Sequence, residues 1–196
     1  MKQKIKFENT VYLFDATFYN FIITDIKKHF ETALHRRFNS VELFDLISYL
    51  ALDLGITESS LISQVIWLHN KETAKLEISQ PSKLKNELDG KAFRNEIGEF
   101  LMASVSTENL VPLSQLFLEV LQMTLESNEV KRIALIGDYN SYGKELFNLL
   151  DAEILKKKEV VLFHMGDVNL KEGVRGEILA YPLMQALGIR ADYLNE

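Results

Sequence analysis

Apolar residues along the chain occur in two patterns, short continuous runs and positions that recur every three or four residues. The short runs are rich in Val, Ile, Leu and Phe and stop at a polar residue, which is typical of strands buried on both faces. The recurring positions predict amphipathic helices that pack one face against a sheet. Strands are predicted at 10–14, 63–70, 100–105, 131–136 and 159–163, with an edge strand at 189–194, and helices at 17–30, 41–54, 110–121, 141–156 and 174–187.

Two of these helices carry further signals. Ser40 can cap the helix at 41–54 and Gly55 can end it. This helix is apolar beyond a single stripe, so it is either sandwiched within the chain or meets a second copy in a homodimer. Gly166, Gly173 and Gly176 predict a flexible connection before the last helix.

Strands that alternate with helices predict an α/β protein, with a largely parallel sheet in three layers and helices on both faces, as in Rossmann-like folds. Segment 71–99 interrupts this alternation with mixed acidic and basic residues, so we expect a solvated hairpin or flap-like insertion there. The chain shows no repeat, low-complexity tract or linker, which favours one α/β domain over 1–196.

Charge and composition narrow the classes of function. The formal net charge of −6 argues against a protein that coats nucleic acid. RNA or a phosphorylated small molecule is a possible partner, but the net charge gives no support for it. The chain has no cysteine, which excludes disulfides, thiolate metal sites and cysteine nucleophiles. Its N-terminus lacks an apolar run of secretory or membrane-spanning length, so we expect a cytoplasmic protein without a membrane segment.

Polar residues follow four of the predicted strands at the point where each strand ends. If these strands are parallel, the residues gather along one edge of the sheet, where open α/β folds bind their ligands. Two carboxylates and two imidazoles there could hold Mg²⁺ or Mn²⁺, and imidazole extends the choice to Zn²⁺. A bound cation would activate water and neutralise a phosphate, which makes phosphoester cleavage the natural chemistry. The residues are Asp15, His69, Asp138 and His164, with Asp167 close behind the last.

The loop GDYNSYG at 137–143 supports this interpretation. Its two glycines allow a close backbone approach, and either Asn140 or Ser141 could cap the next helix, whose N-terminus would attract an anion. The loop nevertheless lacks both common phosphate-binding fingerprints. Tyr139 and Tyr142 could stack on a base, although tyrosines at a sheet edge more often close its core.

Each polar residue also has a purely structural interpretation. Asp15 and Asp138 stand directly before predicted helices, where aspartate commonly accepts hydrogen bonds from free backbone N–H groups. His69 and His164 could be half-buried residues at strand ends. The number of acidic side chains that converge at the edge of the sheet decides between the functional and the structural interpretation. Three or more would favour an enzyme, and two isolated helix caps would favour a non-catalytic protein.

The stretches VYLFD (11–15), IALIGDYNSYGKEL and EVVLF together resemble the PIN and NYN group of metal-dependent ribonuclease folds. The resemblance implies that Asp15 and Asp138 are metal-binding catalytic acids, while Asn140 and Ser141 stand where the family's turn usually carries a second acid. A weaker likeness is to haloacid-dehalogenase-type phosphatases, where Thr17 occupies the place of a second aspartate. The whole sequence is also similar to uncharacterised bacterial proteins grouped as a domain of unknown function.

Two hypotheses of function follow. The first is a metal-dependent phosphoesterase or ribonuclease-like domain in which Asp15 and Asp138 bind Mg²⁺ or Mn²⁺ and His69 or His164 assists. The second is a non-catalytic protein of the same fold that acts as an oligomerisation or protein-interaction module.

Overall fold

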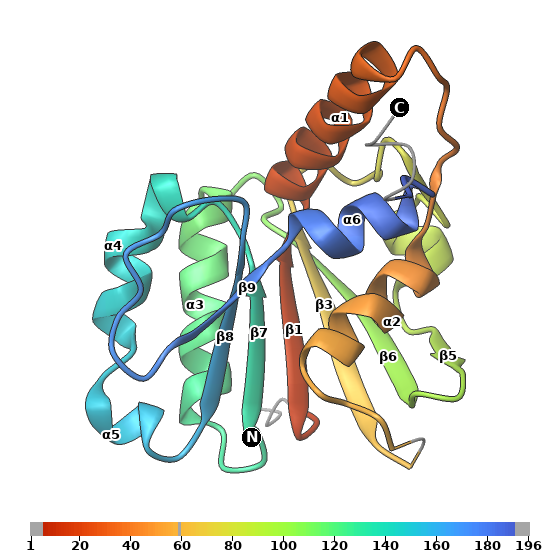
Figure 1. Ribbon diagram of the computed structural model, residues 1–196. Helices are drawn as coiled ribbons and strands as arrows, with labels where there is room; N and C mark the ends of the chain where they lie inside the picture. Colours follow the sequence, from red (N-terminus) through yellow and green to blue (C-terminus); the bar gives the residue numbers. More distant parts are fainter. Residues whose placement is uncertain (1–5, 59, 191–196) are drawn as a thin grey trace.

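A seven-stranded sheet forms the centre of the computed structural model, which describes residues 6–58 and 60–190 (Figure 1). The strand order is β5-β6-β3-β1-β7-β8-β9, and all neighbouring pairs are parallel except β5 and β6. The strands are β1 (Thr10–Asp15), β3 (Ile62–His69), β5 (Ala92–Arg94), β6 (Glu99–Ser106), β7 (Arg132–Ile136), β8 (Glu159–His164) and β9 (Arg175–Ile178).

Helices cover both faces of this sheet. Successive side chains of a strand point to opposite faces, so Tyr12 and Phe14 of β1 join one core and Val11 and Leu13 the other. The first core contains side chains of α1 (Ala16–Ala33), α2 (Leu43–Asp53) and α6 (Ala180–Ala186). The second contains side chains of α3 (Leu113–Glu126), α4 (Tyr139–Leu149) and α5 (Ala152–Leu155). The predicted three-layer, largely parallel α/β fold is therefore confirmed.

The order of the parallel strands defines where a ligand site is expected. Counted along the chain, the parallel strands lie in the order 3-2-1-4-5-6, which is the doubly wound, Rossmann-like arrangement. The chain leaves β1 into α1 on the first face and β7 into α4 on the second. A crevice therefore opens between the carboxyl ends of β1 and β7, which is the usual binding position in such sheets.

Aromatic rings fill the core on the first face. The rings of Phe14 and Trp67 stack with their centroids 4.1 Å apart, and Tyr19 of α1 meets Trp67 edge-on at 5.2 Å. All three side chains are fully buried. The hydroxyl of Tyr19 shares a 2.7 Å hydrogen bond with that of Ser79, whereas the Trp67 indole Nε1 has no partner within the described residues. This cluster fixes α1 against the centre of the sheet.

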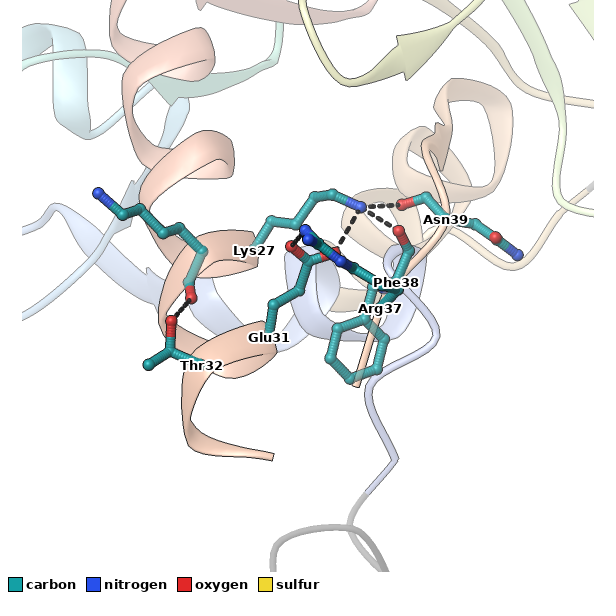
Figure 2. Close-up of polar contacts among 7 residues, drawn as sticks. Lys27, Glu31, Thr32, Arg37, Phe38 and Asn39 are labelled. Atoms are coloured by element: carbon teal, nitrogen blue, oxygen red, sulfur yellow. Dashed lines mark hydrogen bonds and ion pairs between the residues drawn. The ribbon is translucent and has the colours of Figure 1, made fainter. Parts of the chain in front are cut away.

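The far end of α1 extends beyond the carboxyl edge of the sheet (Figure 1). The loop that follows is tied back to the helix by charged side chains (Figure 2). The Lys27 ammonium donates to the backbone carbonyls of Phe38 and Asn39, and Glu31 accepts from the Phe38 N–H at 3.0 Å. Glu31 also pairs with Lys27 at 3.2 Å and Arg37 at 3.1 Å. The hydrogen bond from the Phe38 N–H lowers the pKa of the Glu31 carboxyl most, and Lys27 and Arg37 lower it further.

The helix predicted at 41–54 starts later than its apolar pattern indicates, and the predicted Ser40 cap is wrong. Val41 and Glu42 form the short strand β2 (Val41–Glu42), which pairs in parallel with β4 (Ser79–Gln80). The helix begins at Leu43, whose preceding residue makes no side-chain capping bond. At the other end Gly55, with a φ of 73°, follows the last turn as predicted.

The broad apolar surface of α2 is largely buried within the chain. Its inner side chains join the first core, and α6 packs against it. Of its large apolar residues, Phe44 and Leu52 are the exposed ones, at 37% and 48%. The sandwiched alternative thus describes most of this helix, and the homodimer stays a prediction.

The prediction for the last third of the chain is wrong in two places. The segment expected to be a flexible connection and the start of a helix contains β9, which pairs with β8. Arg175 joins β9 to β8 through an ion pair of 2.8 Å to Glu159, and it also pairs within β9 with Glu177 at 3.2 Å. The final helix therefore begins only at Ala180. The helix predicted at 141–156 is divided into α4 and α5, and the edge strand expected at 189–194 lies mostly outside the described residues.

Segment 71–99 contains β4, the π-helix η1 (Leu84–Leu88) and β5. Its surface is charged, but Leu76, Leu84 and Leu88 are fully buried in the first core. These three leucines anchor the segment beside β3 and β6.

Replacement of Trp67 tests the aromatic cluster. We expect Trp67→Ala to lower the free energy of unfolding by about 3–5 kcal/mol, because it leaves a cavity between Phe14 and Tyr19. Trp67→Phe should cost clearly less, since it keeps a stacked ring and removes the N–H that has no partner. Urea unfolding followed by circular dichroism measures both. Equal losses for the two variants would show that stacking does not stabilise this core.

Candidate functional site

A pocket of about 290 Å³ lies in the crevice of the doubly wound sheet. Its wall is formed by Phe18 at the start of α1, the turn 137–140 after β7, and the turn 164–168 after β8. We call it the switch-point pocket. Its polar lining side chains are Asp138, Asn140, His164 and Asp167.

Asp15 ends β1 directly beside this pocket but does not line it. Its side chain is only 4% exposed. One carboxylate oxygen accepts the Phe18 N–H at 2.9 Å and so caps α1, and the other accepts the Tyr142 hydroxyl at 2.9 Å. Burial raises the pKa of the Asp15 carboxyl, hydrogen bonds from Phe18, Tyr142 and Thr17 oppose this rise, and the nearby charge of Asp138 adds to it.

Tyr142 connects the ends of β1 and β7. Its hydroxyl donates to Asp15 and accepts the backbone N–H of Asp138 at 3.1 Å. The residue has non-helical angles, φ −130° and ψ 17°, so α4 is kinked at this point. The kink and the two bonds fix the turn that carries Asp138. Burial raises the pKa of the Tyr142 phenol, and the adjacent Asp15 charge raises it further, so the phenol keeps its proton.

Gly137 is required by this arrangement. A Cβ atom at this position would lie 2.3 Å from the Tyr142 hydroxyl and 3.2 Å from the Phe117 ring. The close approach expected at Gly137 therefore exists, but the approaching group is Tyr142 rather than a ligand.

Asp138 caps α4, accepting the Ser141 N–H at 3.3 Å, so the cap expected from Asn140 or Ser141 is wrong. Asn140 lines the switch-point pocket, whereas the side chain of Ser141 is exposed outside it. Tyr139 and Tyr142 close the second core, as the structural alternative predicted, because both rings pack there and both hydroxyls are bonded within the protein.

His164 ends β8 in the same pocket. Its Nδ1 is hydrogen-bonded to the Gly166 carbonyl, so the neutral ring carries its proton on Nδ1. Nε2 lies over β9, where a Cβ on Gly176 would approach it to 3.0 Å. Asp167 lines the pocket beside it.

His69 belongs to a different pocket. It is 6% exposed at the end of β3, and its Nδ1 is 2.9 Å from the Asn70 carbonyl. The cavity that it lines measures about 410 Å³ and lies between segment 71–89 and residues 104–109, which are the end of β6 and the turn after it. We call this the His69 pocket.

The four predicted metal-site residues thus lie along one edge of the sheet but in three settings. Asp138 and His164 share the switch-point pocket, Asp15 is enclosed behind it, and His69 lines its own pocket. Over the described ranges 6–58 and 60–190, no group of three or more His, Asp or Glu side chains is placed to hold a metal ion.

Sequence reasoning did not identify two of the residues that build the site. The apolar spacing of the helix at 17–30 places Phe18 on a packing face and gives no sign that it lines a pocket, and nothing in the pattern pairs Tyr142 with Asp15. The sequence offers no signal for a bond across 127 positions.

The fold and the pocket define an α/β domain with a doubly wound sheet and a crevice of the kind that binds ligands. The chain belongs to a family whose description is "Family of unknown function (DUF6621)", and the match covers residues 4–194. Neither the curated proteins nor the solved structures gave a match. The similarity to a domain of unknown function is confirmed, and the likeness to PIN and NYN nucleases stays a prediction. No helix in the described part of the chain combines the length and apolar character that a membrane crossing requires.

Tyr142→Phe tests the bridge between the two strand ends. The change removes a donor from the buried Asp15 carboxylate and an acceptor from the Asp138 N–H, so we expect it to cost about 1–3 kcal/mol of unfolding free energy. Tyr181→Phe is the matched control, because that tyrosine is 65% exposed on α6 and should change stability by less than about 0.5 kcal/mol. Equal effects of the two variants would contradict the bridge.

The pH dependence of stability tests the environment of Asp15. Because its folded pKa lies above the ordinary 3.8, folded Asp15 holds its proton where the unfolded chain releases it. This contribution to stability is complete below pH 3.8 and is lost as the pH rises through the folded pKa. Relative to Asp15→Asn, which does not titrate, the wild type should therefore lose stability as the pH rises from 4 to 8, measured by urea unfolding. A relative gain over this interval would mean that the hydrogen bonds outweigh burial.

Proposed function

We propose that this chain is a small-molecule-binding α/β domain and that its ligand occupies the switch-point pocket. One observation carries the proposal: the crevice at the strand-order reversal contains a pocket lined by two carboxylates, an imidazole and an amide. Ligands of doubly wound sheets bind at this position because connections leave it toward opposite faces.

Charge selects the class of ligand. Asp138 and Asp167 place negative charge in the pocket, and like charges in contact cost several kcal/mol, so a bare phosphate is disfavoured. Hydroxyl groups donate well to carboxylates, and acidic residues in sheets of this type accept ribose hydroxyls. The Phe18 ring offers an apolar face for a planar group. These features fit a neutral, hydroxyl-bearing ring compound of the ribonucleoside class.

In this proposal Asp15 is a positioning residue. Both of its oxygens already accept hydrogen bonds from the protein, and its carboxylate is nearly inaccessible. Its contribution is to hold Tyr142, and through Tyr142 the turn that carries Asp138.

The second candidate is the metal-dependent phosphoesterase or ribonuclease activity that the sequence resemblance implies. The position of Asp138 and Asp167 in one pocket favours it, because Mg²⁺ often binds through one or two carboxylates, several waters and the substrate's phosphates. The cation would then admit the phosphate that the carboxylates alone repel.

Thermal unfolding with added ligands separates the two candidates. We expect ribonucleosides without metal to raise the midpoint by roughly 5–10 °C at a hundredfold excess over Kd. Asp138→Asn, which keeps the helix cap, and Asp167→Asn should each weaken binding at least about tenfold through the lost charge-assisted hydrogen bond.

Asp151→Asn is the matched control, since Asp151 caps α5 outside the pocket and should leave the shift unchanged. A shift that needs both Mn²⁺ and a nucleoside monophosphate, and that the two pocket variants abolish, would replace the first candidate by the second. The absence of any shift, or equal shifts in all variants, would contradict both.

A further inference from the structure

The His69 pocket has the chemistry of a separate binding site. It opens at the carboxyl ends of β3 and β6, on the other side of β1 from the turns that form the switch-point pocket. Its volume of about 410 Å³ is sufficient for a small metabolite. The charged and polar residues that line it are His69, Lys71, Lys85, Asp89, Glu108 and Asn109, together with Ser104 and Ser106.

His69 forms the buried part of this pocket with one ring nitrogen unused. The residue is only 6% exposed. Its Nδ1 donates a hydrogen bond to the Asn70 carbonyl, because a carbonyl oxygen can only accept. Its Nε2 has no hydrogen-bond partner among the residues that the structure describes. Nε2 is not one of the fully buried atoms without a partner in this part of the chain, so it is open to solvent or to a ligand in the pocket. When the ring is protonated, this atom becomes a donor to an anion.

Two lysines line this pocket together with the imidazole. Lys71 follows β3 and Lys85 lies in η1, and neither makes an ion pair within 6–58 or 60–190. Lys27 in Figure 2 is the contrast, because Glu31 and two backbone carbonyls occupy its ammonium group. The lysines of the pocket are therefore free to bind an anion.

Two acids limit the size of that anion. Asp89 lines the pocket, and one of its oxygens is committed to the Ser104 N–H at 2.9 Å. Glu108 also lines the pocket. A long polyanion would have to pass both carboxylates on a chain of net charge −6, whereas a small anion can reach the lysines directly.

The backbone around the pocket has unusual geometry. Lys85 is carried by a π-helix, a conformation that is rare and frequent at functional sites. Glu108 and Asn109 both have positive φ, 49° and 58°, held by hydrogen bonds from their N–H groups to the hydroxyls of Ser106 and Thr107. Such conformations persist where the surrounding structure fixes them, and they cluster at ligand sites.

We propose that the His69 pocket binds a small anionic ligand through a carboxylate or phosphate group, which lies between Lys71 and Lys85 with the His69 imidazole at its base. The site is independent of the switch-point pocket, so the protein binds two ligands of different chemistry along one edge of its sheet.

Imidazole resonances report on this site directly. The four histidines can be assigned in the ¹⁵N-labelled protein from His29→Gln, His35→Gln and His164→Gln, which leaves His69. Inorganic phosphate and malonate are titrated separately, at constant ionic strength against chloride. We expect a saturable shift of the His69 Nε2 resonance with at least one of them, and the anion that saturates at the lower concentration identifies the group bound.

Lys71→Gln combined with Lys85→Gln should lower the affinity for the anion that gives the saturable shift at least tenfold. The matched control is Lys83→Gln combined with Lys91→Gln, which removes the same charge from exposed positions outside the pocket and should leave the affinity unchanged. The proposal is overturned if neither anion gives a saturable shift, if both double variants weaken binding equally, or if a single-stranded oligonucleotide displaces the anion at lower concentration.

Discussion

The hydrogen bond between the Tyr142 hydroxyl and the Asp15 carboxylate, 2.9 Å long, joins the ends of β1 and β7 at the place where the sheet reverses its strand order. The same hydroxyl accepts the N–H of Asp138, and Asp15 caps α1 with its other oxygen. Both side chains are almost fully buried. If one of them were removed, the other would be left as a buried polar group without a partner, and this would destabilise the fold by more than the hydrogen bond itself contributes. Two helices that leave toward opposite faces are therefore held in one geometry, and the switch-point pocket lies between them.

The sheet was predictable because continuous apolar runs have one physical cause. A strand buried on both faces needs apolar side chains at consecutive positions, and β1, β3, β7 and β8 each contain four of them in a row, at 11–14, 65–68, 133–136 and 160–163. β9 was missed because its RGEI sequence has little apolar character and its place depends on pairing with β8 and on the Arg175–Glu159 ion pair. The start of α2 was missed because Val41 pairs with Ser79, a contact between distant segments that local pattern does not contain.

The sequence predicted that the candidate site residues lie at one edge of the sheet, but it did not predict which face of the sheet each side chain points to. Asp15 lies opposite Leu68 in the parallel register, so His69 is one position further and points to the other face. This single step points the His69 side chain away from the Asp15 carboxylate, and its pocket forms at the ends of β3 and β6 instead. Lys85 could not have been assigned to either pocket, because its place depends on a π-helix that the leucines at 84 and 88 anchor.

A double-mutant cycle on Asp15→Ala and Tyr142→Phe measures the joining interaction most directly. Because the two side chains are in contact and nearly buried, their coupling free energy should fall between about 0.5 and 3 kcal/mol and stabilise the folded protein. Strictly additive losses of stability would show that the two strand ends are held independently and that the Tyr142–Asp15 hydrogen bond does not fix the crevice.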